Sequence, residues 1–293
     1  MLAVAYREDF LGIRRRPGGL VRVVADRRIV GDSDAATIGR VTMDALYPDP
    51  PHLTIAVWVA ENEELTFGRA CDTVGELGLV PSGVVEVAPR GRQFGMVQDL
   101  EDRSTVLLGP VEFESMLHGG DPVSRSLKAG YRGGRLGTVV VEHLFGTDGE
   151  AHPVAVSVSA DALGLPEELW KAKDRKAAYK LAGWATDVLR RLAGRTGAVY
   201  GAIAVEETLP TPSALRTGAS IAGLPFLSAE LPASVLDKFH AAFGRTQPVH
   251  WAEGTLFPGW KPFAQGNPAA VDRAALAAAS AALGNALTVG ELW

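Results

Sequence analysis

Few residues of this chain have the type and spacing for acid–base chemistry, and His118 is the first of them. It is followed by Gly119-Gly120-Asp121, a spacing at which a carboxylate can orient an imidazole that serves as a general base. A helix that ends at a histidine and is stopped by glycines has the same sequence, and we favour this structural interpretation. His118 and Asp121 are therefore catalytic candidates only if the protein is an enzyme.

Two further histidines, His143 and His152, flank Asp148-Gly149, a residue pair preferred in tight hairpin turns. If this pair forms a two-residue turn, His143 lies opposite Val154 and the two histidines are diagonal neighbours on one face. With Asp148 or Glu150 they would then offer ligands for a metal ion. The same face carries valines, which predicts that it points into the core and that the histidines complete its rim. We therefore expect no metal and no cofactor.

The short motifs that mark common enzyme classes are absent from the sequence. There is no Gly-Lys-Ser/Thr of a P-loop, no Gly-x-Ser-x-Gly elbow and no His-Glu-x-x-His. The glycines from Gly130 to Gly137 precede a predicted strand, whereas those of a dinucleotide motif follow a strand and open a helix. Glu206 and Glu207 end a strand and should point to opposite faces, so they cannot form a carboxylate pair.

The charge and cysteine content exclude several kinds of partner. The chain has 29 basic and 34 acidic residues, a net charge of −5, and neither half has the basic excess that phosphate binding requires. Cys71, the single cysteine, cannot form an intrachain disulfide, and we expect it in the core of a protein from a reducing compartment. We therefore expect neither a disulfide-linked partner nor a nucleic acid. The sequence also has no run of about 20 apolar residues that could span a membrane. We expect a cytoplasmic protein that binds another protein.

The densest group of aromatic residues lies near the C-terminus, where Trp251, Phe257, Trp260 and Phe263 fall within a short stretch. Packing in the core and in a hairpin is the common explanation, and a recognition surface that anchors a partner is the alternative. The candidate partner-binding residues are Trp251, Glu253, Trp260 and Trp293.

The elements that must position these residues are those of an α+β protein with two consecutive units, residues 1–135 and 136–293. Each unit is expected to be a mostly antiparallel sheet covered by helices. In the first unit the apolar run from Leu53 to Ala60 predicts a central strand. Thr66 is expected to cap the next helix, which Gly78 ends in a left-handed conformation. The other elements expected here are strands at 2–6, 20–25, 84–88 and 105–108 and helices at 34–46 and 110–117.

The second unit is expected to open with a hairpin of strands 138–145 and 152–159. Pro166 then begins a long helix, 166–193, with an apolar stripe from Ala177 to Leu192. Lysines at 171, 173, 176 and 180 on this helix indicate a solvated face. The remaining elements expected are strands at 198–205 and 249–257 and a proline-rich connection over 209–232. Two helices are also expected, one that carries Val235, Leu236, Phe239 and Phe243 and an alanine-rich one over 271–287.

Part of the second unit resembles the α+β immunity-type proteins that are encoded beside bacterial polymorphic toxins. The residues that carry the resemblance are Gly183-Trp184, Tyr200-Gly201, Leu209-Pro210-Thr211-Pro212, Phe226-Leu227-Ser228 and Trp251, Gly254 and Gly259-Trp260. The resemblance covers less than a third of the chain and consists mostly of packing and turn residues. It implies a cytoplasmic protein that binds a cognate toxin and blocks it without catalysis of its own.

Three functions remain open at this point. We favour a non-catalytic protein-binding protein, because catalytic motifs are missing and aromatic residues gather near the C-terminus. The first alternative is an enzyme that uses His118 with Asp121, or the histidine pair. The second is a structural subunit of a larger assembly, for which the 33 glycines and the long connections would provide contact arms.

Overall fold

The computed structural model describes residues 23–24, 46–60, 63–89, 104–107, 109, 111, 113, 125–143, 150–163, 171–244, 246–257 and 271–288. Its strands are β1 (Val23–Val24), β2 (His52–Trp58), β3 (Val80–Pro89), β4 (Ser104–Leu107), β5 (Arg125–Gly133), β6 (Gly137–His143), β7 (Val154–Ser159), β8 (Tyr200–Val205), β9 (Leu224–Ser228), β10 (Val249–His250) and β11 (Gly254–Leu256). Its helices are α3 (Glu63–Glu76), α5 (Ala172–Thr196), α6 (Pro212–Arg216), α7 (Ala233–Phe243) and α8 (Arg273–Ala286), with short 3-10 turns η2 (Gly134–Leu136) and η3 (Asp161–Leu163).

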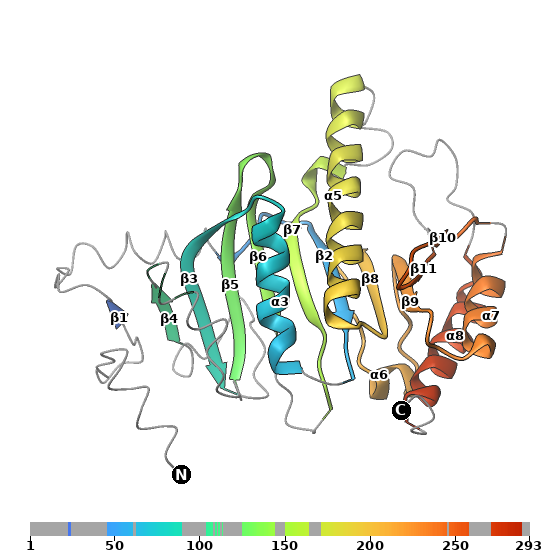
Figure 1. Cartoon of the computed structure of the whole chain (residues 1–293). Coiled ribbons are helices and arrows are strands. Elements are labelled where there is room, and N and C mark those ends of the chain that lie inside the picture. The colour runs from blue at the N-terminus through green and yellow to red at the C-terminus, as the bar shows by residue number, and fades with distance from the viewer. Residues whose placement is uncertain are drawn as a thin grey trace, which may run out of the picture.

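These strands form one sheet in the order β1-β4-β3-β5-β6-β7-β2-β8-β9-β11-β10 (Figure 1). Every neighbouring pair is antiparallel except β1 and β4, which are parallel. The expected α+β class, with a mostly antiparallel sheet covered by helices, is confirmed. The division into residues 1–135 and 136–293 stays a prediction, and the sheet is continuous across that boundary, which falls in the η2 turn between β5 and β6.

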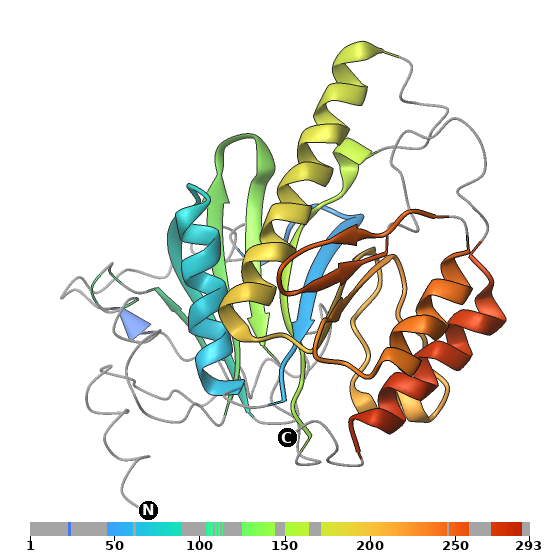
Figure 2. The ribbon, with the colours of Figure 1, turned by 45° about the vertical axis from the view of Figure 1, so that its right-hand side comes forward.

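Helices cover both faces of the sheet, and alternating residues of the strands divide between two cores. Ile55 and Val57 of β2 lie in the core beneath α3 and α5, which cross in front of the strands in Figure 1. Ala56 and Trp58 belong to the second core, which α6, α7 and α8 build beside β8 and β9 (Figure 2). This two-sided burial confirms the central strand expected over 53–60, since β2 pairs with β7 on one side and β8 on the other.

The helix after β2 differs from its prediction at the start and agrees with it at the end. Thr66 lies inside α3, which begins at Glu63, and its side chain is buried, so the expected cap was wrong. The helix begins before its first buried side chains, since Leu65 is exposed and Thr66 is buried, so the apolar pattern placed the start too late. Gly78 has φ of 84°, as predicted, and the Leu79 N–H donates to the carbonyl of Val74 at 3.2 Å. Cys71 is buried in the core beneath this helix, also as predicted.

The long helix of the second half begins later than expected. α5 starts at Ala172 after an extended Lys171, so the predicted start at 166 was wrong. The helix continues to Thr196, three residues past the predicted end at 193, and a left-handed Gly197 follows it. Ala178 is buried and Ala177 is exposed, whereas the predicted stripe began at Ala177. Two adjacent alanines fit the helical period about equally well, so the pattern does not distinguish them. No helix in the part of the chain that is described has both the length and the apolar character to cross a membrane.

Two strands were assigned incorrectly from the sequence. The connection over 209–232 contains β9, whose five residues are all buried. The strand expected over 249–257 is a hairpin of β10 and β11, because the Trp251 N–H donates to the Gly254 carbonyl at 2.8 Å and turns the chain. By contrast, the β6–β7 pairing places His143 opposite Val154 as predicted, although the turn over 144–149 lies outside the described residues.

The strand expected at 2–6 and the first part of the helix expected at 34–46 also lie outside the described residues.

Candidate functional site

Several of the candidate residues cannot be placed. His118 and Asp121, the catalytic candidates, lie outside the described residues, as do Trp260 and Trp293 of the partner-binding set. Their roles stay predictions from the sequence. The site is therefore built from the residues whose surroundings the structure gives, which are the histidine pair, the β10–β11 hairpin and the loop after β8.

His143 ends β6 on the side of the strand whose Val139 and Val141 lie in the core beneath α3 and α5. His143 is 1% exposed beyond the core valines of β6, and His152 is half-buried two residues before β7. Glu150, one of the two carboxylates considered as a third ligand, instead accepts hydrogen bonds from the backbone N–H of Ser213, at 2.7 Å, and from its hydroxyl. Within the described ranges no group of three or more His, Cys, Asp or Glu side chains could hold a metal ion.

Trp251 fixes the β10–β11 hairpin to the rest of the sheet. Its ring stacks on Phe226 of β9 with the ring centroids 5.6 Å apart, and the half-buried indole packs against the core beneath α5. The same turn is held from the other side, because the carbonyl of Glu253 accepts from the Ala229 N–H at 3.0 Å. The Glu253 side chain lies over Gly194 near the end of α5. Trp251 and Glu253 thus give the hairpin a fixed position.

The backbone of this hairpin is packed too closely to accept larger residues. A Cβ on Gly254 would lie 2.1 Å from the carbonyl oxygen of Leu227, so only glycine permits β11 to approach β9 at this point. Gly201 has the same role between β8 and β2, where a Cβ would lie 2.6 Å from the Ala56 carbonyl oxygen. These glycines, with Phe226 and Trp251, belong to the residues that carry the resemblance to immunity-type proteins. The structure brings them together as packing residues of one stretch of sheet.

The outer strand of the hairpin is exposed. Val249 has 44% of its surface accessible, and both residues of β10 are exposed at the end of the strand order. His250 contacts Thr255 across the hairpin, with its Nδ1 3.2 Å from the threonine hydroxyl. A strand at the end of a sheet presents backbone donors and acceptors that another chain can pair with. The hairpin therefore combines a rigid base with an exposed edge.

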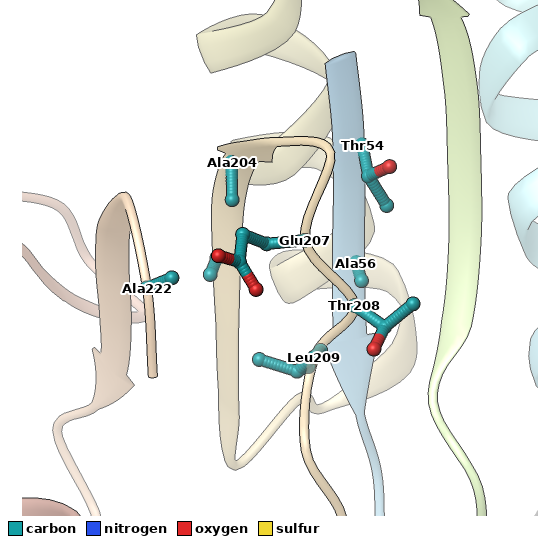
Figure 3. A pocket seen from close by; sticks show the side chains of 8 residues that line it. Thr54, Ala56, Ala204, Glu207, Thr208, Leu209 and Ala222 are labelled. Carbon is teal, nitrogen blue, oxygen red and sulfur yellow. The ribbon is translucent and has the colours of Figure 1, made fainter. Parts of the chain in front are cut away.

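A shallow pocket lies over the face of β2 and β8 that carries Ala56 and Ala202, beneath the loop that follows β8 (Figure 3). Its empty volume is about 210 Å³, including space open to solvent, and small side chains form its floor. The pocket is lined by Thr54, Ala56, Ala202, Ala204, Glu207, Thr208, Leu209 and Ala222. Glu207 turns its carboxylate toward β8 in Figure 3.

The loop over this pocket is shaped by Glu206, the neighbour of Glu207. Glu206 has φ of 56°, a conformation that side chains other than glycine adopt at a cost. Its carboxylate accepts a hydrogen bond from the backbone N–H of His52 and lies 3.1 Å from the His52 Nδ1, which compensates for this conformation. Because β8 ends at Val205, Glu206 and Glu207 both lie in the loop, and the prediction that they end the strand was wrong. Their side chains still have different neighbours, since Glu206 contacts His52 and Glu207 lines the pocket.

The environment of Tyr200 clearly changes its acidity. Burial raises the pKa of its phenol well above the usual 10.0, and the Glu150 carboxylate raises it further. The hydroxyl donates to the Pro210 carbonyl at 2.7 Å, and the ring stacks on Trp58 at 5.3 Å between centroids. A phenol held neutral in this way locks the loop over 206–210 to the sheet.

Comparison with known proteins gives no identification. No family model matches the sequence, and no curated protein matches it. Among solved structures, the Pseudomonas aeruginosa T6SS protein PA0821 aligns with 80% of this chain and 72% of its own, at 11% sequence identity and a TM-score of 0.37. A likeness at this TM-score carries no argument about fold or activity. The function is therefore argued from the geometry of the chain itself.

The sequence did not predict β9, the strand that supports the β10–β11 hairpin. Trp251 was a candidate as a member of an aromatic group, but its stacking partner Phe226 lay in a connection that was not assigned to a strand. The signal that could have found β9 is Leu224 to Ser228, a short apolar run after Gly223 with its φ of 70°. That pattern predicts a buried strand that follows a turn.

Proposed function

We propose that this protein is a non-catalytic binding protein of the immunity type, which occupies a surface of a cognate bacterial toxin. The β10–β11 hairpin is the contact, with Val249 and His250 at its edge and Trp251 and Glu253 at its turn. The observation that carries the proposal is the exposed strand β10 on a hairpin whose base is fixed by the Trp251–Phe226 stack.

Two physical arguments support this use of the hairpin. Binding costs free energy whenever loops and side chains must be ordered, and a hairpin already held by stacking and by hydrogen bonds avoids much of that cost. An exposed valine beside a partly accessible tryptophan also provides the apolar centre from which protein interfaces derive most of their affinity. The backbone of β10 can add hydrogen bonds to an extended segment of the partner.

The test uses the full chain with a purification tag in its native cells. We expect a protein to co-purify at a fixed stoichiometry, and Val249→Asp to abolish the complex because it places a charge at the centre of the contact. Val80→Asp is the matched control, since Val80 is 65% exposed on β3, far from β10 in the strand order. Its complex should survive.

Two results would contradict the proposal. Recovery of the chain alone from native cells would count against a stable partner. Equal retention of the complex by Val249→Asp and Val80→Asp would show that the hairpin is not the contact. A further assay separates an immunity-type role from other binding. The wild-type chain should neutralise the toxicity of the co-purified protein, and Val249→Asp should fail to neutralise it.

A further inference from the structure

The first turns of α5 have no place in the core. The first buried side chain of this helix is that of Ala178, and residues 172–177 bury none. Figure 1 shows this end of α5 rising beyond the strands that the rest of the helix covers. At 1.5 Å per residue these six residues extend the helix by about 9 Å. Packing therefore does not explain why the helix continues here.

The charge of this projecting segment is opposite to that of the whole chain. Residues 171–180, called here the basic end of α5, contain five basic residues and one acid: Lys171, Lys173, Asp174, Arg175, Lys176 and Lys180. The net charge of the chain is −5. Lys173, Lys176 and Lys180 follow one another at three- and four-residue steps and so form a stripe along one side of the helix. All three lysines are exposed.

Among the described residues, the stripe of Lys173, Lys176 and Lys180 is electrostatically unfavourable. Positive charges at the start of a helix oppose its dipole, and like charges three or four residues apart repel each other. Farther along α5 the charges are compensated, because Arg190 pairs with Asp187 at 3.6 Å and Arg191 with Glu76 of α3 at 3.8 Å. No ion pair joins Lys171, Lys173, Lys176 or Lys180 to another residue of the described part.

We infer that the basic end of α5 is a second interaction surface, which binds an acidic segment of a protein. An acidic partner would remove the repulsion along the stripe, so binding there gains more than at isolated lysines. Tyr179, which is 61% exposed between Lys176 and Lys180, supplies the aromatic surface that protein interfaces favour. The net charge of −5 disfavours a nucleic acid, whose phosphates extend well beyond one short helix end.

The test measures binding of the full chain to a synthetic glutamate-rich peptide by fluorescence anisotropy, with a serine–glycine peptide as the neutral reference. We expect binding that weakens steeply with added salt, because exposed charges are screened. The triple variant Lys173→Glu, Lys176→Glu and Lys180→Glu should weaken it by about tenfold or more, the sum of three exposed charge contacts.

The matched control carries the same change of net charge elsewhere. Arg132→Glu, Arg135→Glu and Lys238→Glu replaces three exposed basic residues on β5, η2 and α7, and it should retain at least most of the affinity. Equal loss in both variants, or no binding at low ionic strength, would overturn the inference. Tighter binding of a single-stranded DNA of the same charge would overturn it in favour of a nucleic acid. The peptide assay does not involve β10, so its failure leaves the hairpin proposal standing.

Discussion

A single hydrogen bond distinguishes Trp58 from Trp184. The indole N–H of Trp58 donates to the Ala151 carbonyl at 2.8 Å and ties β2 to the segment before β7. The indole N–H of Trp184 on α5 is buried and has no acceptor among the residues that are described. A buried donor without a partner costs free energy, whereas a satisfied one contributes. The same residue type thus has opposite energetic consequences at the two positions.

Replacement by phenylalanine separates these two cases. Trp58→Phe removes a made hydrogen bond and leaves the Ala151 carbonyl without its donor, so it should lower the free energy of unfolding by about 1 kcal/mol more than Trp184→Phe does. Trp184→Phe removes only an unsatisfied N–H, which offsets part of the packing lost with the larger ring. Urea unfolding followed by circular dichroism measures both. Equal losses would mean that the two N–H groups are equally well satisfied.

At the scale of the elements, close approach of strands is as important as side-chain packing. The hairpin of β10 and β11 reaches β9 only because Gly254 has no side chain, and the stack of Trp251 on Phe226 depends on that approach. Gly183 of α5 is a contrasting glycine, since a Cβ there would meet nothing within 4 Å. Its position in a helix interior favours alanine.

An alanine at each glycine should therefore shift stability in opposite directions. Gly254→Ala forces β11 away from Leu227 and should lower the free energy of unfolding by about 2 kcal/mol or more, as overpacking does. Gly183→Ala should raise it by about 0.5–1 kcal/mol. Thermal unfolding checks both variants. The interpretation of the hairpin fails if Gly254→Ala is as stable as the wild-type protein.

For the whole molecule, the decisive feature is the position of β2 in the sheet. β2, from the first half of the sequence, lies between β7 and β8 of the second half and pairs with both along nearly its full length. Ile55 and Ala56 place its two faces in different cores. The strands of the second half are therefore joined through β2, a strand of the first half, and β2 contributes side chains to the cores on both faces.

A fragment of residues 136–293 tests how far the two halves are independent. Without β2 it would expose the edges of β7 and β8 and the apolar face of α5, so we expect it to aggregate or to remain unfolded. Circular dichroism and analytical ultracentrifugation give the result. A monomeric fragment with a cooperative unfolding transition would instead support the division into two units that the sequence predicts.

Local patterns in the sequence determined many of the elements of this protein. The apolar run before Ala60, the left-handed Gly78, the buried Cys71 and the pairing of His143 with Val154 all follow from side-chain period and turn chemistry, which act over a few residues. Only the tertiary structure decided that β2 lies between β7 and β8 and that Phe226 supports Trp251. Those contacts join residues far apart in sequence, and their free energy comes from burial between elements, which no local pattern encodes.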